Sequence, residues 1–141
     1  MQDSVTNTVD TGLKSLADEA PVKVRISGIC MMPLINDGAV IQVSRQRIYL
    51  PGDILIKRAH NNRLIAHRLI GCYPRKGGLH YVTRADIAEN ADSAISASQV
   101  IGKLSGGDCE AAAIKIPVKS RIRALGQFFV LLIQRIRRKK I

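Results

Sequence analysis

The 141-residue sequence is poor in aromatic residues and in cysteine. It contains no tryptophan, and aromatic residues make up 4% of it, so it offers no run of rings on which the bases of a nucleic acid could stack. The three cysteines, Cys30, Cys72 and Cys109, are an odd number, lie far apart and form no Cys-x-x-Cys pair. This usage argues against a disulfide framework or a zinc site, and it favours free thiols in a reducing compartment, with no cofactor.

Acidic residues are absent from the C-terminal segment, Ile114 to Ile141. The net charge of the chain is +11, and this segment holds nine of the 22 basic residues. The other 113 residues carry 13 basic and 11 acidic groups, a net +2. The body of the protein is therefore nearly neutral, and the positive charge belongs to the C-terminal segment, where it could meet a membrane surface or a nucleic acid.

Residues 1–20 lack the basic start and the apolar core of a secretory signal peptide. We expect a polar lead-in there, with one short helix around Thr11 to Ala20. Residues 21–113 hold six β-like runs separated by turn residues, and they predict a mostly β domain built on a folded antiparallel sheet. The runs are Val22–Ser27, Ala39–Ser44, Asp53–Ala59, Arg63–Ile70, Leu79–Arg84 and Gln99–Leu104.

Residues 114–141 predict a basic amphipathic helix, because apolar residues recur at steps of three or four from Ile122 to Ile136. Only 11 uncharged residues lie between Arg123 and Arg135, and at about 1.5 Å per residue they would cover roughly half of the hydrocarbon thickness of a bilayer. We therefore expect the helix to lie among anionic headgroups, with a helix docked on the body or on a partner as the alternative. The expected membrane contacts are Phe128, Phe129, Leu132 and Arg135.

Four residues could carry chemistry, although each has a simpler explanation. Cys30 follows a strand end and precedes Pro33, so its side chain can project from a corner, but a lone cysteine is more often a small buried residue. His67 shares a face of its predicted strand with apolar neighbours, where a histidine is usually a satisfied core residue. Asp86 and Asp92 lie in a loop, where carboxylates ordinarily accept the hydrogen bonds of turns.

Taken in chain order, these residues stand in motifs that resemble the signal peptidase family in its archaeal and endoplasmic-reticulum form, within the serine-peptidase clan that includes the LexA repressor. The motifs read GICMMP around Cys30, GDI after Pro51, AHRLIG around His67 and TRAD ending at Asp86, and the resemblance spans about Val22 to Leu104. It implies a β core of the signal peptidase and LexA type, with a nucleophile, a base and an orienting carboxylate. The implied catalytic residues are Cys30, His67, and Asp86 or Asp92, and the residues that complete the motifs are Gly28, Met31, Pro33 and Arg68.

Three positions depart from the family's pattern. Cys30 replaces a serine, Ala39 stands where aspartate is usual, and Arg84-Ala85 replace Lys-Gly. A thiol ionises more readily than a hydroxyl, and Cys–His pairs with a third orienting group are a known solution to acyl transfer. We therefore expect an endopeptidase that cleaves an extended peptide, with Cys30 as the nucleophile and His67 as the base. An inactive peptide-binding relative, or a chain whose serine had been replaced, fits the same residues.

Two other functions fit the sequence less well. A self-cleaving repressor needs a DNA-binding domain, and about twenty residues before the first strand are too few for a helix-turn-helix. The C-terminal charge allows a basic nucleic-acid-binding protein, but no recognised RNA-binding motif is present. Free thiols and a basic C-terminal helix together favour a peripheral protein on the cytoplasmic face of a membrane, with a polypeptide as its substrate.

Overall fold

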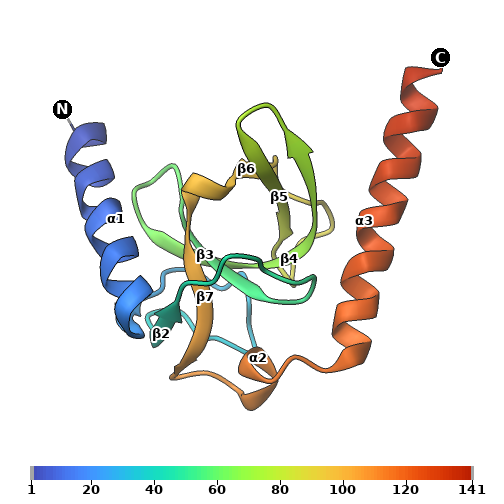
Figure 1. Cartoon of the computed structure of the whole chain (residues 1–141). Helices are drawn as coiled ribbons and strands as arrows, with labels where there is room; N and C mark the ends of the chain where they lie inside the picture. Colours follow the sequence, from blue (N-terminus) through green and yellow to red (C-terminus); the bar gives the residue numbers. More distant parts are fainter. Residues whose placement is uncertain (1, 141) are drawn as a thin grey trace.

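The computed structural model describes residues 2–140, which form one sheet with a long helix before it and another after it (Figure 1). Helix α1 (Gln2–Glu19) precedes the sheet and helix α3 (Val118–Lys139) follows it, while the short helices η1 (Ala97–Gln99) and α2 (Ala111–Ile114) flank the last strand. The strands are β1 (Val22–Arg25), β2 (Val40–Ser44), β3 (Ile54–Arg58), β4 (Leu64–Arg75), β5 (Gly78–Arg84), β6 (Ile95–Ser96) and β7 (Val100–Gly107).

The seven strands form a single antiparallel sheet in the order β1-β2-β7-β3-β4-β5-β6. The sheet curls into a half-barrel, and the two long helices stand on opposite sides of it (Figure 1). A mostly antiparallel sheet with a C-terminal helix is therefore confirmed. The sequence predicted six strands, and the seventh, β6, is only two residues long, too short to show a period of two.

The core is divided between two faces of the sheet. Paired residues of adjacent strands lie on the same face, so Ile56 and its partner Ala66 belong to one face and Leu55 and its partner His67 to the other. The first face carries the larger apolar cluster, in which Ile41 and Ile56 are fully buried. Each such side chain contributes about 2 kcal/mol of hydrophobic stabilisation, so this face holds much of the folding free energy.

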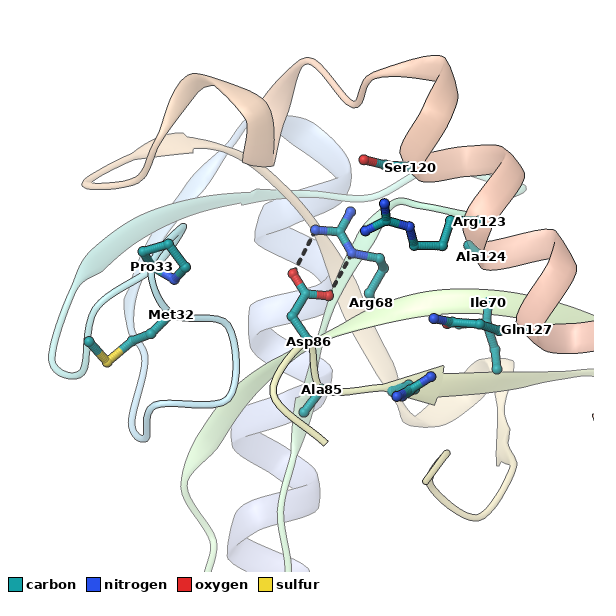
Figure 2. A pocket seen from close by; sticks show the side chains of 11 residues that line it. Met32, Pro33, Arg68, Ile70, Ala85, Asp86, Ser120, Arg123, Ala124 and Gln127 are labelled. Carbon is teal, nitrogen blue, oxygen red and sulfur yellow. Dashed lines mark hydrogen bonds and ion pairs between the residues drawn. The ribbon is translucent and has the colours of Figure 1, made fainter. Parts of the chain in front are cut away.

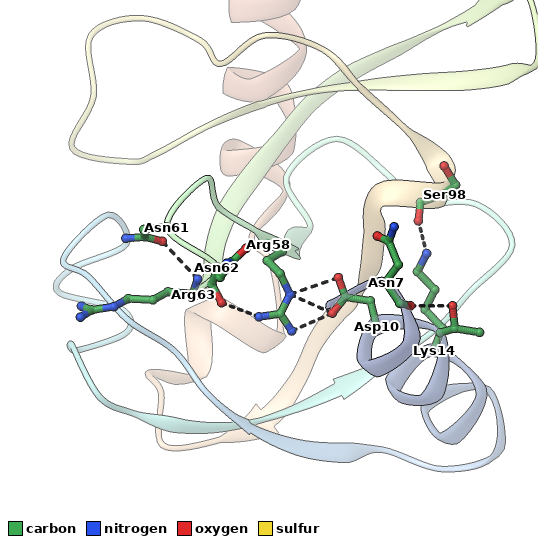
Figure 3. A network of polar contacts seen from close by, with 9 residues as sticks. Asn7, Asp10, Lys14, Arg58, Asn61, Asn62, Arg63 and Ser98 are labelled. Carbon is green, nitrogen blue, oxygen red and sulfur yellow. Dashed lines mark hydrogen bonds and ion pairs between the residues drawn. The ribbon is translucent and has the colours of Figure 1, made fainter. Parts of the chain in front are cut away.

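Helix α1 is longer than the short helix expected around Thr11 to Ala20, and contacts with β3 and η1 hold its middle. The Arg58 guanidinium on β3 donates to both carboxylate oxygens of Asp10, at 2.7 to 3.1 Å, and also to the carbonyl of Asn62 (Figure 3). One turn further on, the Lys14 ammonium donates to the carbonyl of Ser98 (Figure 3). Threonine, asparagine and aspartate favour helices weakly, so the sequence of the N-terminal half alone does not predict a helix.

Helix α3 packs one face against β4 and β5. Ala124 is 1% exposed, and Phe128 fills the space above Gly71, where an added Cβ would overlap its ring. At the start of the helix, Arg121 donates to Asp53 and to the carbonyl of Pro51, both at 3.0 Å. The helix is therefore fixed to the body by its first half, beside the segment that carries Cys30.

Candidate active site

Cys30 lies in a turn that runs beside an unpaired edge of β4. Strand β5 pairs with β4 from Arg68 onward, so the part of β4 before it, Leu64 to His67, has no β5 neighbour. The segment leading to Cys30 takes that place, because Ser27 N donates to Leu64 O at 3.0 Å. The topology thus brings the Cys30 turn next to the part of β4 that carries His67.

Two local features shape the turn around Cys30. Gly28 has a φ of +95°, a conformation that side chains rarely adopt, and its N–H donates to the Asp37 carboxylate at 2.7 Å. The Cys30 carbonyl accepts a hydrogen bond of 3.4 Å from Ile87 N, just beyond the end of β5. The Cys30 side chain is half-buried at a narrow hollow that it lines together with Gly28, Met31 and Ala66.

His67 belongs to a polar network that crosses three strands. Its Nδ1 is hydrogen-bonded to Asp92 Oδ2, and the same oxygen accepts from Thr83 Oγ1 at 2.8 Å and from Lys57 Nζ at 3.0 Å. Because an ionised carboxylate can only accept, Nδ1 of His67 carries the hydrogen. The other ring nitrogen, Nε2, is buried and has no hydrogen-bond partner.

The network holds Asp92 in its charged form. Burial by itself raises the pKa of Asp92, but hydrogen bonds from His67, Thr83 and Lys57 outweigh it and leave that pKa well below its usual value. Lys57 itself is 8% exposed and donates to Thr83 Oγ1 as well, at 3.1 Å. The arrangement fixes an anion behind the imidazole, which orients the ring.

The structure separates the two aspartates that the sequence left as alternatives. Asp92 contacts His67, whereas Asp86 accepts two hydrogen bonds of 2.8 Å from Arg68 (Figure 2). Arg68 also donates to the carbonyl of Gly52 at 2.9 Å, so the pair ties β4 to two loops. Asp86 therefore supports the site, and it does not orient the imidazole.

Cys30 and His67 come from neighbouring segments without a direct bond. No hydrogen bond joins Cys30 Sγ to the imidazole within residues 2–140, and Nε2 stays unpaired. Of the other motif residues, Met31 is 2% exposed and packs in the larger core cluster, which holds the turn to the body. Pro33 is exposed to solvent. Cys30 packs against the cluster on the Ala66 face of the sheet, whereas His67 lies on the Leu55 face, and catalytic hydrogen bonds are often long before substrate binds.

Lys57 is the member of the network that sequence reasoning missed. Its signal was a single charged residue at the fourth position of β3, a strand whose first four residues are all buried. A buried lysine needs a charged partner, but which one is set by long-range pairing of β3 with β4. In the described part of the chain no group of three or more His, Cys, Asp or Glu side chains could hold a metal ion.

The expected membrane contacts of α3 divide between its two faces. Phe129 is 57% exposed, and Arg135 is exposed as well. Phe128 packs on Gly71 and is half-buried, and so is Leu132. No helix among residues 2–140 combines the length and apolar character needed to cross a bilayer.

No protein-family model matches this chain, and no curated protein matches it in sequence.

Proposed function

We propose that this protein is an endopeptidase of the signal peptidase and LexA type, with Cys30 as nucleophile and His67 as base. The observation that carries the proposal is the state of the His67 ring, whose Nδ1 is held by Asp92 while Nε2 is buried and has no partner among residues 2–140, on the stretch of β4 along which the Cys30 segment runs. A satisfied core histidine would use both nitrogens. An imidazole with one oriented nitrogen and one free nitrogen is suited to accept a proton from a neighbouring thiol.

The reaction we propose runs in two halves. Rotation of the Cys30 side chain brings the thiol to Nε2 of His67, which takes its proton as the sulfur attacks the peptide carbonyl. Backbone N–H groups of the Cys30 turn stabilise the oxyanion, and the protonated imidazole then gives its proton to the departing amine, leaving a thioester on Cys30. Water, deprotonated by His67, attacks the thioester, releases a carboxylic acid and restores the thiol.

Beyond the bond from Ser27 to Leu64, the edge of β4 up to His67 has no β5 neighbour and supports an extended peptide as the substrate. A peptide strand can add to such an edge through main-chain hydrogen bonds, with its side chains directed alternately into the protein.

Helix α3 supports a membrane surface as the place of action. Its face opposite the sheet exposes a stripe of large apolar residues, namely Ile122, Leu125, Phe129, Ile133 and Ile136, which are 40% to 63% exposed. Basic residues flank this stripe, and no acidic residue lies on the helix. Apolar side chains between cations match the interface of an anionic bilayer, in which we place the stripe.

The test of the peptidase is a Cys30-dependent thioester. The full-length protein is mixed with a proteome-derived peptide library and quenched in acid, and intact-protein and peptide mass spectrometry then follow acyl adducts and new peptide termini. Wild type is expected to form both, whereas Cys30→Ala forms neither. His67→Ala loses turnover, and Cys72→Ala, which removes an exposed thiol outside the site, serves as the control. Peptide binding without adducts or new termini would instead identify a peptide-binding relative.

A further inference from the structure

A pocket adjoins the Cys30 turn. It has a volume of about 320 Å³ and lies between the turn, the end of β5 and the first turns of α3 (Figure 2). Met32 and Pro33, which directly follow the Cys30–Met31 pair, form one wall, and Ser120 and Arg123 on α3 form the opposite one. A peptide bound across Cys30 would therefore reach this pocket.

Three arginines and one aspartate line the pocket, so its charge is strongly positive. Asp86 uses both of its oxygens for Arg68, and that ion pair is neutral as a unit. Arg84 donates through Nε to the carbonyl of Ala88 at 2.7 Å, which leaves its charge without a carboxylate. Arg123 is exposed and forms no hydrogen bond or ion pair with any residue that the structure describes.

The Arg123 side chain extends from α3 toward Arg68 (Figure 2). Two guanidinium groups that line one pocket repel each other unless an anion lies between them. A guanidinium presents a planar fork of N–H donors, which fits the two oxygens of a carboxylate better than it fits a neutral amide. The pocket also offers the side chains of Ser120 and Gln127 as hydrogen-bonding groups.

We propose that this pocket binds an acidic side chain of the substrate, an aspartate or glutamate in the peptide just beyond the cleaved bond. Arg123 and Arg84 are the specificity-determining residues, and the Arg68–Asp86 pair forms the floor. The proposal rests on the proposed peptidase function, since it assigns a recognition site to the same substrate. It adds a chemical requirement that neither the hollow nor the catalytic residues impose.

The experiment compares cleavage-site composition between variants of the full-length protein. A proteome-derived peptide library is digested with wild type, and residues around each Cys30-dependent cut are counted. Aspartate and glutamate are expected to be enriched beyond the cut, and matched peptides with Asp and Asn at that position should differ in kcat/KM by about tenfold, the effect of one charge-assisted hydrogen bond. Arg123→Glu is expected to abolish this preference and to favour lysine instead.

Arg47→Glu is the matched control, because Arg47 is another exposed arginine without an ion pair in the described chain, far in sequence from the pocket residues. It should keep the wild-type ratio between the Asp and Asn peptides. Cys30-dependent cuts without acidic enrichment, or an unchanged ratio in Arg123→Glu, would overturn the pocket assignment while leaving the peptidase intact. The absence of any Cys30-dependent cut would instead overturn the peptidase itself.

Discussion

Asp92 accepts a hydrogen bond from Nδ1 of His67, and the opposite nitrogen of the same ring has no partner. The two residues are 25 positions apart in sequence and meet because β5 places Thr83 and the loop after it beside β4. This contact makes the tautomer of His67 a property of the fold and leaves Nε2 as the nitrogen that can accept a proton.

The first prediction concerns the reactivity of Cys30. If His67 accepts the thiol proton, iodoacetamide should modify Cys30 at neutral pH, and His67→Ala should slow that reaction by about tenfold or more, because only the thiolate is nucleophilic. Peptide mass spectrometry resolves the three cysteines. Exposed Cys72 provides the internal reference and should react equally in both proteins. Cys109, whose pKa is raised by burial and by nearby acidic residues, should react slowly in both.

Equal labelling rates for Cys30 in wild type and His67→Ala would contradict this activation. Asp92→Asn should give an intermediate labelling rate, since an amide can hold the imidazole ring without supplying a charge. We expect it to label Cys30 faster than His67→Ala and slower than wild type.

The second prediction concerns stability against acid. The pKa of Asp92 is lowered in the folded protein, so the folded state is stabilised by the charged form of this residue. That contribution is complete above the unfolded pKa, about pH 4, and is lost as the pH falls further toward the folded value. Asp92→Asn should lower the free energy of unfolding by about 2 kcal/mol at neutral pH, since Lys57 and His67 lose their carboxylate.

Urea denaturation of wild type and Asp92→Asn at several pH values measures this difference. It should be largest at neutral pH and shrink below about pH 4. Asp37→Asn is the control, because this exposed carboxylate lies outside the Asp92 network and its effect should not follow the same profile. A constant difference between wild type and Asp92→Asn down to the acid transition would argue against a charged Asp92.

The third prediction concerns the docking of α3. A methyl group at Gly71 would overlap the ring of Phe128, so Gly71→Ala should destabilise the protein by about 1–3 kcal/mol. In the background of Phe128→Ala the same substitution should cost much less, because the ring has been removed. Gly126→Ala, on the same helix with no atom within 4 Å of the new methyl group, should be stabilising by up to about 1 kcal/mol.

Thermal unfolding of wild type, Gly71→Ala, Phe128→Ala and the double variant tests the contact as a double-mutant cycle. Additive effects of Gly71→Ala and Phe128→Ala would show that the two residues do not meet.

Alternating apolar residues were enough to predict the antiparallel sheet, and three- and four-residue spacing was enough to predict α3. Spacing could not decide which of the adjacent residues Phe128 and Phe129 faces the sheet, because α3 carries apolar residues on two sides. The choice depends on Gly71, whose missing side chain makes room for one ring. Lys57 was missed for a related reason, since its partner Asp92 is 35 residues away.

The last prediction concerns the membrane. Phe129 and Leu16 are equally exposed, at 57% and 56%, but Phe129 lies on a helix with basic residues toward both ends and no acidic residue, whereas α1 carries several acids. Phe129→Glu should reduce binding to vesicles of equal parts phosphatidylcholine and phosphatidylglycerol by about tenfold or more, because it removes buried apolar area and adds a repelled charge.

Leu16→Glu is the matched control and should bind like wild type. Co-sedimentation measures both, with vesicles of phosphatidylcholine alone expected to bind weakly. Equal binding by the two variants, or salt-sensitive binding to duplex DNA that persists in Phe129→Glu while vesicles are not bound, would place the basic helix on another partner.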